Sequence, residues 1–334
     1  MQLLFLRFVL ATTVLAITPL LVAQQTLLLA SQKASSSVGF YTMDGKLLAT
    51  VPVGKHPHEL AISTDGRYAY TTDNGTMAIE EELQGNNTVS VVDLHSRKRT
   101  AAISLGKFYR PHGIAVVPTT GNLLVTTENP SHLVMVDPKA QKVVRTYDIK
   151  GDFPHIVSAS SDGKWAYVSN AKSDSVAVVE LATGAVTLIP VGTRPEGSIL
   201  SKDGKRLYVV SRVASEISVI DTEKKTKIRT IKTAEGPVRV GLSPDEKYAI
   251  YGTISGNGVG FADLETGKEV TLVPVDKMRL VSMHISPDGK WALTGAQYDD
   301  TVYVVDIAAR KLHTKFTTPK GAGPDPVRAI SVPN

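Results

Sequence analysis

The chain has 334 residues, of which 42% are hydrophobic and 21% charged, and its 26 glycines and 18 prolines indicate a globular protein with many tight turns. Cysteine is absent, which excludes disulfides, thiolate metal sites, cysteine nucleophiles and covalent c-type haem attachment. The formal net charge of +5 comes without a run of lysine and arginine, so we interpret it as solubility and expect no nucleic-acid partner.

Residues 1–23 differ from the rest of the chain. A single charged residue, Arg7, precedes an apolar run over residues 8–22 and the small residue Ala23. This pattern predicts a signal peptide cleaved before Gln24, and the alternative is an uncleaved N-terminal anchor. No second long apolar stretch follows, so we expect no membrane span in the mature chain and a periplasmic or extracellular location.

A repeat runs through the remainder of the sequence. Turns of the type Asp-Gly-Lys or Asp-Glu-Lys begin at Asp162, Asp203, Asp245 and Asp288, at steps of 41, 42 and 43 residues. In the unit that starts at Pro154, alternating apolar residues predict strands over residues 155–160, 165–169, 175–180 and 185–191. Four short strands in a repeat of this length are typical of a propeller blade.

The two ends of the sequence complete one further copy of the repeat. Residues 26–31, 37–43 and 46–53 align with a second, third and fourth strand, and residues 326–334 align with a first strand. First strands are then predicted at residues 58, 112, 155, 196, 238, 281 and 327. We therefore predict an all-β protein: a single seven-bladed β-propeller over residues 24–334 with one-plus-three strand closure, which hides the sheet edges, and we expect a monomer.

Residues 87–94, 173–181 and 216–222, each followed by a short turn and a further strand, resemble the YVTN-type propeller repeat. The resemblance covers the chain from about residue 25 to its end and implies the propeller fold. It also implies a relation to lactonase-like propellers and to the haem-binding propeller of cytochrome-type nitrite reductases. Because that group includes surface proteins, DNA-binding periplasmic proteins and enzymes, the resemblance leaves the function open.

Each first strand begins with a leading residue, which is proline in six copies and Leu280 in the other. The residue after it differs between the copies. It is histidine in three consecutive blades, glutamate in the next and valine in the last three, namely His58, His112, His155, Glu196, Val238, Val281 and Val327. Since first strands line the channel, three imidazoles at one mouth predict a zinc or copper site, with Glu196 as a ligand or general base. The alternative is that each histidine only hydrogen-bonds a neighbouring loop.

Further polar residues are predicted at the same mouth. We expect a small anionic ligand to bind there, because guanidinium groups pair well with anions. The residues predicted to contact it are Arg110, Arg194, Arg239, Arg279, Arg328 and Glu128. The alternative is that each arginine is solvated or paired with a local acid. An insertion over residues 75–84 is expected to form a short helical lid, and His284 is expected to pack inside the channel.

Two functions follow from these patterns. The first is an exported binding protein whose channel mouth binds a metal ion, a small anionic ligand or a partner protein. The second is a metal-dependent, lactonase-like hydrolase or lyase, in which the three histidines hold a metal ion and Glu196 is the base. Nucleic-acid binding is a third possibility, and it predicts an affinity that falls steeply with salt.

Overall fold

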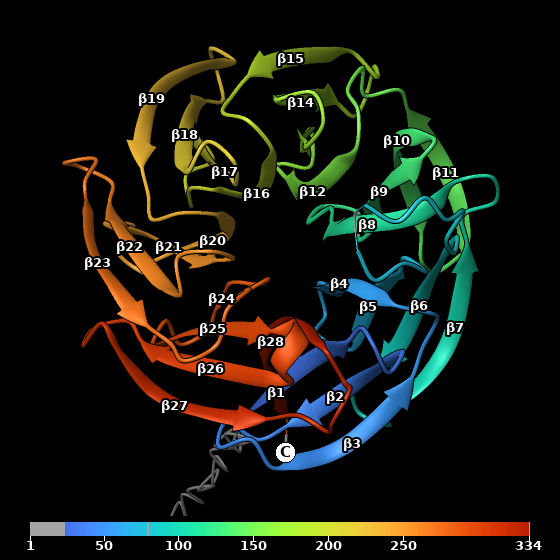
Figure 1. The fold of residues 1–334 in the computed structure, drawn as a ribbon. Coiled ribbons are helices and arrows are strands. Elements are labelled where there is room, and N and C mark those ends of the chain that lie inside the picture. The colour runs from blue at the N-terminus through green and yellow to red at the C-terminus, as the bar shows by residue number, and fades with distance from the viewer. Residues whose placement is uncertain (1–23, 79, 334) are drawn as a thin grey trace, which may run out of the picture.

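The computed structural model describes residues 24–78 and 80–333, so the predicted signal peptide lies outside the described residues. The strands form seven four-stranded antiparallel sheets, which surround a central channel as blades (Figure 1). In the described residues, helix is limited to the single 3-10 turn η1 (Gln297–Asp299). The prediction of an all-β seven-bladed propeller is therefore confirmed.

The strands of each blade run from the channel to the outer surface in the order in which they are named here. The first blade contains β28 (Pro324–Pro333), β1 (Gln24–Gln32), β2 (Ser37–Tyr41) and β3 (Leu47–Pro52). The second contains β4 (Pro57–Ile62), β5 (Tyr68–Asp73), β6 (Thr88–Asp93) and β7 (Lys98–Ser104), and the third contains β8 (Tyr109–Val116), β9 (Leu123–Asn129), β10 (Ser131–Asp137) and β11 (Lys142–Tyr147).

The other four blades repeat this order. The fourth contains β12 (Pro154–Ala159), β13 (Trp165–Asn170), β14 (Ser175–Glu180) and β15 (Val186–Pro190), and the fifth contains β16 (Pro195–Leu200), β17 (Arg206–Ser211), β18 (Glu216–Asp221) and β19 (Thr226–Lys232). The sixth contains β20 (Pro237–Leu242), β21 (Tyr248–Thr253), β22 (Gly258–Asp263) and β23 (Glu269–Pro274), and the seventh contains β24 (His284–Ile285), β25 (Trp291–Ala296), β26 (Thr301–Asp306) and β27 (Lys311–Thr317).

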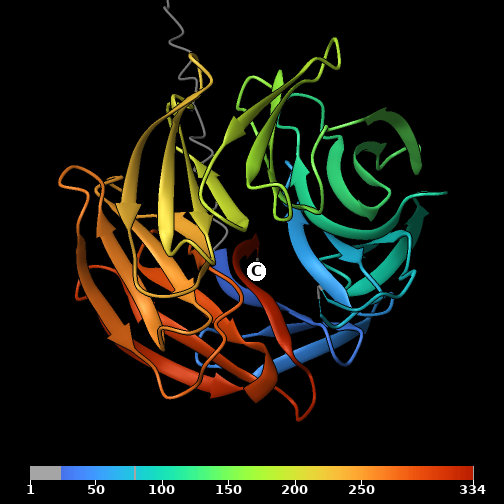
Figure 2. The same ribbon diagram turned by 45° about the horizontal axis from the view of Figure 1, so that its top comes forward.

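The ring closes inside the first blade, as predicted. β28, from the end of the chain, pairs antiparallel with β1, and the register places Ala329 opposite Leu28 and Val327 opposite Ala30. All four of these side chains are buried. Figure 2 shows β28, in red, lying along the channel beside strands of the last blade. Because β28 covers the inner edge of β1, no open edge faces the channel at the junction.

The repeated turn owes its shape to a serine that precedes each aspartate by two residues. In the fourth blade, Ser160 Oγ donates to Asp162 Oδ1 at 2.6 Å and accepts from the Trp165 N–H at 2.9 Å, while Gly163 has a φ of +69°. A positive φ favours glycine, which explains the Asp-Gly pair. The same serine-aspartate bond recurs at Ser63, Ser201, Ser243 and Ser286.

The hydrophobic core lies between neighbouring blades. One cluster joins Val89 and Ile103 of the second blade to Leu123 and Val125 of the third, and equivalent clusters fill the other blade contacts. The third strand of a blade is buried along most of its length, whereas the fourth strand is largely exposed. A single blade could not bury both of its faces, so the complete ring supplies the core.

The seventh blade departs from the predicted repeat, because the first strand expected from Val281 is only two residues long. Ser282 Oγ accepts the Gly295 N–H at 2.9 Å, and Thr294 Oγ1 donates to the Ser282 carbonyl at 2.6 Å. These side chains bond backbone groups that a regular ladder would pair with each other. Regular pairing with β25 therefore covers only His284 and Ile285.

Candidate functional site

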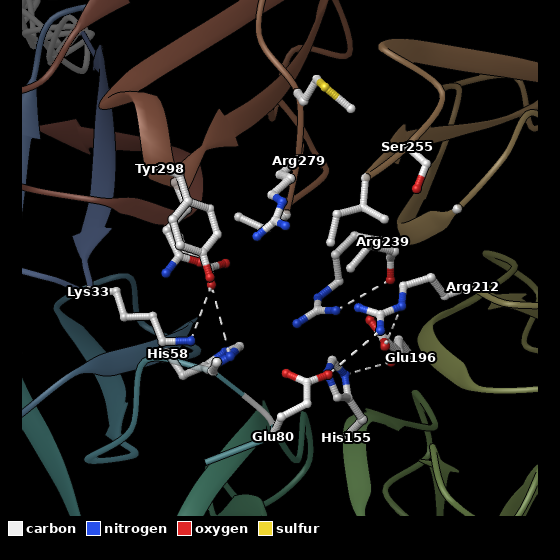
Figure 3. A pocket seen from close by; sticks show the side chains of 18 of the residues that line it. Lys33, His58, Glu80, His155, Glu196, Arg212, Arg239, Ser255, Arg279 and Tyr298 are labelled. Atoms are coloured by element: carbon white, nitrogen blue, oxygen red, sulfur yellow. Dashed lines mark hydrogen bonds and ion pairs between the residues drawn. The ribbon is translucent and has the colours of Figure 1, made fainter.

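A cavity of about 720 Å³ opens at one end of the channel and is called the channel mouth here (Figure 3). Its wall includes the residues that follow the leading position of the first strands in six blades, namely His58, His112, His155, Glu196, Val238 and Val281. Residues of the insertion, Met77, Ala78 and Glu80, complete another part of the wall. In Figure 3, Arg279 and Tyr298 face Glu80 and His155 across the cavity.

Three buried imidazoles form a bent row in this cavity. The ring centroids of His58 and His112 lie 3.7 Å apart, those of His112 and His155 lie 3.8 Å apart, and those of His58 and His155 lie 6.3 Å apart. Burial, together with the neighbouring histidines and cations, holds the pKa values of His58 and His155 well below 6.5, and burial lowers the pKa of His112. The three rings are therefore neutral near pH 7.

The partners of His112 and His155 determine which ring nitrogen carries the proton. His112 Nδ1 lies 2.6 Å from Glu128 Oε1, and His155 Nδ1 lies 3.0 Å from the Glu196 carbonyl. Both partners are acceptors, so Nδ1 is the donor in each ring and Nε2 keeps a free lone pair. His112 Nε2 and His58 Nδ1 are buried without a hydrogen-bond partner.

Neighbouring rings are tilted against each other by 42° and 43°, and the rings of His58 and His155 are nearly perpendicular. Within residues 24–78 and 80–333, no three histidine, aspartate or glutamate side chains are arranged as a metal-binding group. The donor chemistry nevertheless suits a transition metal, because neutral imidazoles whose Nδ1 bonds an acceptor are typical zinc or copper ligands. The unpartnered nitrogens are consistent with a polar occupant of the channel mouth.

Two further buried charged residues, Lys33 and Asp325, lie beside His58. Lys33 Nζ is 3.8 Å and His58 Nε2 is 3.9 Å from Asp325 Oδ2, so neither is a close hydrogen bond, and Asp325 Oδ1 has no partner among the described residues. Burial raises the pKa of Asp325 to about 7 and lowers the pKa of Lys33. This group therefore adds further unsatisfied polar atoms to the same wall.

The insertion, residues 75–84, is held over the cavity by ion pairs and is called the lid loop here. Glu80 lies 2.9 Å from Arg194 and 4.0 Å from Arg212, and the same two guanidinium groups lie 3.0 and 3.3 Å from Glu196 Oε1. Arg110 bonds the lid carbonyl of residue 81. The loop does not form the expected helix, because its described residues consist of bends, one turn residue and irregular segments.

A buried ion pair crosses the channel below the histidines. Arg239 Nε and Nη2 donate to Glu59 Oε1 at 3.1 and 2.6 Å, and both side chains are less than 10% exposed. Arg239 lines the channel mouth and also a second cavity of about 520 Å³, whose wall includes Glu59. The pair therefore lies between the two cavities.

A family model described as the choice-of-anchor I domain matches residues 20–198, which is more than half of the chain. The chain belongs to the choice-of-anchor I domain family. Within the described residues of this family member, no helix is long and apolar enough to cross a membrane.

Two curated proteins share part of their sequence with this member of the family. The seven-bladed beta-propeller protein Rv1057 of Mycobacterium tuberculosis is 26% identical over 241 residues, which cover 63% of this chain and 60% of the relative. Antigen Lp49 of Leptospira interrogans is 30% identical over 125 residues, which cover 33% of this chain and 27% of the relative. The matched regions thus span less than two thirds of either relative.

Solved structures share the fold at low identity. A functionally unknown protein from Desulfotomaculum acetoxidans has a TM-score of 0.74 at 13% identity, covering 90% of this chain and 98% of that one. The dihydro-heme d1 dehydrogenase NirN, solved in complex with DHE, has a TM-score of 0.66 at 19% identity (90% and 74% coverage). Hydrazine synthase of Kuenenia stuttgartiensis has a TM-score of 0.65 at 21% identity (75% and 76% coverage). These likenesses show the fold alone, and the narrower YVTN-type assignment stays a prediction.

The choice-of-anchor I propeller brings many of the predicted site residues to one cavity. The channel mouth is lined by the predicted metal ligands and base, His58, His112, His155 and Glu196, and by Arg239 and Arg279. Arg110 and Glu128 do not line it; they bond each other, and Glu128 also bonds His112. Arg194 contacts the lid loop and Glu196.

Of the five arginines predicted at one mouth, Arg239 and Arg279 line the cavity, whereas Arg110, Arg194 and Arg328 do not. Arg110, Arg194 and Arg279 stand immediately before the leading residue of a first strand, where each has a φ between +54° and +60°. Arg239 and Arg328 stand three residues further along, inside the channel. Arg328 lines the second cavity and not the channel mouth.

Two charged residues of the channel mouth lie outside the set that the sequence singles out. Lys33 follows β1, and Asp325 occupies the position before a leading proline where other blades carry Arg110 or Arg194. Alignment of the repeats could have identified Asp325, because other copies carry a basic residue at the same position. Lys33 has no equivalent signal, because only the fold places it beside Asp325.

Proposed function

We propose that this chain is a propeller binding protein that holds a transition-metal ion, zinc or copper, at its channel mouth on His58, His112 and His155. The observation that carries the proposal is the hydrogen bonding of two of the three rings: His112 Nδ1 donates to Glu128 and His155 Nδ1 to the Glu196 carbonyl. Each Nε2 is then a neutral donor atom with a free lone pair.

The unpartnered atoms support the same assignment. His112 Nε2 and His58 Nδ1 are buried without a hydrogen bond, and a buried polar atom in that state destabilises the fold by about 1 to 3 kcal/mol. An ion bound by the ring nitrogens would remove this penalty. The low pKa values of the three histidines also favour metal binding, because no proton has to be displaced near pH 7.

The space beside the histidines suits a small acidic ligand. A volume of about 720 Å³ falls in the range of small-molecule sites. Among the described residues, Arg279 has no acid within 4 Å and lies against the Tyr298 ring at 5.0 Å, so its guanidinium is available to a carboxylate. A protein partner that presents an acidic side chain is the alternative occupant.

We infer that the protein works outside the cytoplasm. The predicted signal peptide over residues 1–23 and the description of the family as choice-of-anchor support an exported or surface-associated protein. N-terminal sequencing of the exported protein is expected to begin at Gln24. A chain that retains Met1 in the cytoplasm would contradict the inference.

The hydrolase or lyase alternative finds no support in the position of Glu196. Its Oε1 is contacted by two guanidinium groups, those of Arg194 and Arg212, and these contacts connect Glu196 to the lid loop. A general base needs an acceptor atom within reach of the reacting proton. Glu196 is therefore assigned to holding the lid, and binding without turnover is the proposed activity.

Metal content of the purified chain tests the proposal. After loading with zinc or copper and removal of the excess, elemental analysis is expected to find about one ion per chain, and chelation is expected to lower the Tm by several degrees. His112→Gln is expected to lose the ion and the response to chelation. His284→Gln, which changes a channel histidine of the second cavity, is the matched control and should retain both.

Two results would overturn the proposal. One is the absence of stoichiometric zinc and copper from the loaded wild-type chain, with a Tm that chelation leaves unchanged. The other is a full complement of metal in a folded His112→Gln variant, which would place the ion elsewhere.

A further inference from the structure

The second cavity lies in the channel, mainly between the inner strands of the fifth, sixth, seventh and first blades. It has a volume of about 520 Å³ and is formed by β16, β20, the segment around β24 and β28. Aliphatic side chains make up much of its wall, namely Ile156, Ile199, Leu200, Val240, Leu242 and Ile285. Apolar surface of this kind favours the hydrocarbon part of a ligand.

Arg328 contributes a guanidinium group to this wall. Among the described residues, no carboxylate lies within 4 Å of Arg328, whereas Arg239 beside it is neutralised by Glu59. Burial in the channel lowers the pKa of Arg328 from its usual value, and Glu59 opposes that effect only partly. A partly buried guanidinium without a counter-charge is an unfavourable state that an anion would relieve.

The other charged groups of the wall are engaged elsewhere. Lys202 donates its Nζ to the Pro244 carbonyl and its backbone N–H to Glu246 Oε1. Asp288 accepts Ser286 Oγ and the Lys290 N–H within its own turn. His284 is neutral near pH 7, because burial and then Arg328 lower its pKa to about 3. Among the described residues of this wall, Arg328 is therefore the basic side chain with neither a hydrogen bond nor an ion pair, whereas Lys202 bonds a carbonyl and Arg239 bonds Glu59.

We propose that the second cavity binds an organic monocarboxylate, with the carboxylate on the Arg328 guanidinium and its hydrocarbon chain against the aliphatic wall. The planar fork of arginine matches a carboxylate through two parallel N–H···O bonds. One unpaired charge matches a monoanion, and the apolar wall matches a ligand with a hydrocarbon body. The site is separate from the proposed metal site, because the Glu59–Arg239 pair lies between the two cavities.

Binding of octanoate to the full mature chain tests this proposal. Titration calorimetry is expected to detect octanoate, and saturating octanoate is expected to raise the Tm by at least about 2 °C. Octanamide, which has the same chain without the charge, should bind at least tenfold more weakly. Inorganic phosphate distinguishes a general anion site, and tighter binding of phosphate than of octanoate would overturn the assignment to an organic acid.

Three variants identify the responsible charge. Arg328→Met should abolish the octanoate response and leave the Tm of the free protein equal to or above that of the wild type, because an unpaired charge is removed. Arg328→Lys keeps the charge without the fork and should weaken binding about tenfold or more. Arg67→Met, whose side chain is 63% exposed and lines neither cavity, is the matched control and should bind octanoate normally.

Two results with Arg328→Met would contradict the proposal. An unchanged octanoate response would show that the ligand binds elsewhere. A Tm of the free variant lower by about 5 °C or more would show that Arg328 has a structural partner. Either result leaves the metal-binding proposal intact, because that proposal depends on His112 and not on Arg328.

Discussion

Burial controls the charge of individual residues in this channel. Lys33, His58, His112, His155 and His284 all have lowered pKa values, and desolvation is the largest cause in each case. The arginines stay charged at this depth and are held by acids, as Arg239 is by Glu59, with Arg328 as the exception. The residue type therefore decides whether a buried base loses its charge or needs a counter-ion.

His284 gives the clearest pH dependence. Its pKa in the folded chain is about 3, below the ordinary value of 6.5, so the unfolded chain takes up the proton first as the pH falls. The free energy of unfolding then decreases by about 1.4 kcal/mol per pH unit below the unfolded pKa. Relative to His284→Gln, the wild type should lose about 2 to 3 kcal/mol between pH 6 and pH 4, measured by urea denaturation.

The comparison of wild type and variant cancels the titration of every other group. Equal losses of stability in the two proteins would show that His284 titrates normally in the folded chain. The same outcome would mean that water solvates the imidazole in the second cavity.

Among the elements, β24 is a short strand beside which a side chain takes the place of a regular backbone partner. Ser282 is 2% exposed, and its Oγ accepts the Gly295 N–H at 2.9 Å where a longer strand would supply a carbonyl. Ser282→Ala leaves that buried N–H without an acceptor. We expect the free energy of unfolding to fall by about 1 to 3 kcal/mol and hydrogen exchange at Gly295 to accelerate.

An exposed serine provides the control for this variant. Ser161 lies in an exposed turn, and Ser161→Ala should change the free energy of unfolding by less than about 0.5 kcal/mol. If Ser282→Ala were equally neutral, the Gly295 N–H would have another acceptor, and the short length of β24 would need a different explanation.

For the whole molecule, ring closure by β28 is the critical contact. Deletion of residues 324–334 removes the strand that pairs with β1 and takes Val327, Ala329 and Ile330 from two core clusters. We expect the truncated chain to lose its cooperative thermal transition and to aggregate, because the open edge of β1 can pair with other chains. Circular dichroism melting and size-exclusion chromatography measure both effects.

A rearranged chain controls for the loss of those residues. β28 runs antiparallel to β1, with Pro333 opposite Gln24, so residues 324–333 can be joined before residue 24 through a short turn. This permuted chain keeps every strand of the first blade and should melt close to the wild-type Tm. A cooperative transition in the truncated chain would show that six complete blades suffice.

Much of the candidate site follows from the position of residues within the repeat. His58, His112, His155 and Glu196 line one mouth because each follows the leading residue of the first strand in one of four neighbouring blades. The same logic fails for Arg328, since it stands three residues deeper than Arg279 and projects into another cavity. Position along the strand, and not residue type, decides which end of the channel a side chain reaches.

The sequence by itself determined the blade number, the strands and the closure, because turn chemistry and alternating hydrophobicity act within a few residues of one another. The tertiary structure alone decided the pairs across the channel, such as Glu59 with Arg239 and Lys33 with Asp325. Those contacts form only when the seven blades are assembled into a closed ring. Local patterns carry no information on the assembled ring, so the partners of the channel charges, and the lack of a partner for Arg328, are decided only by the closed fold.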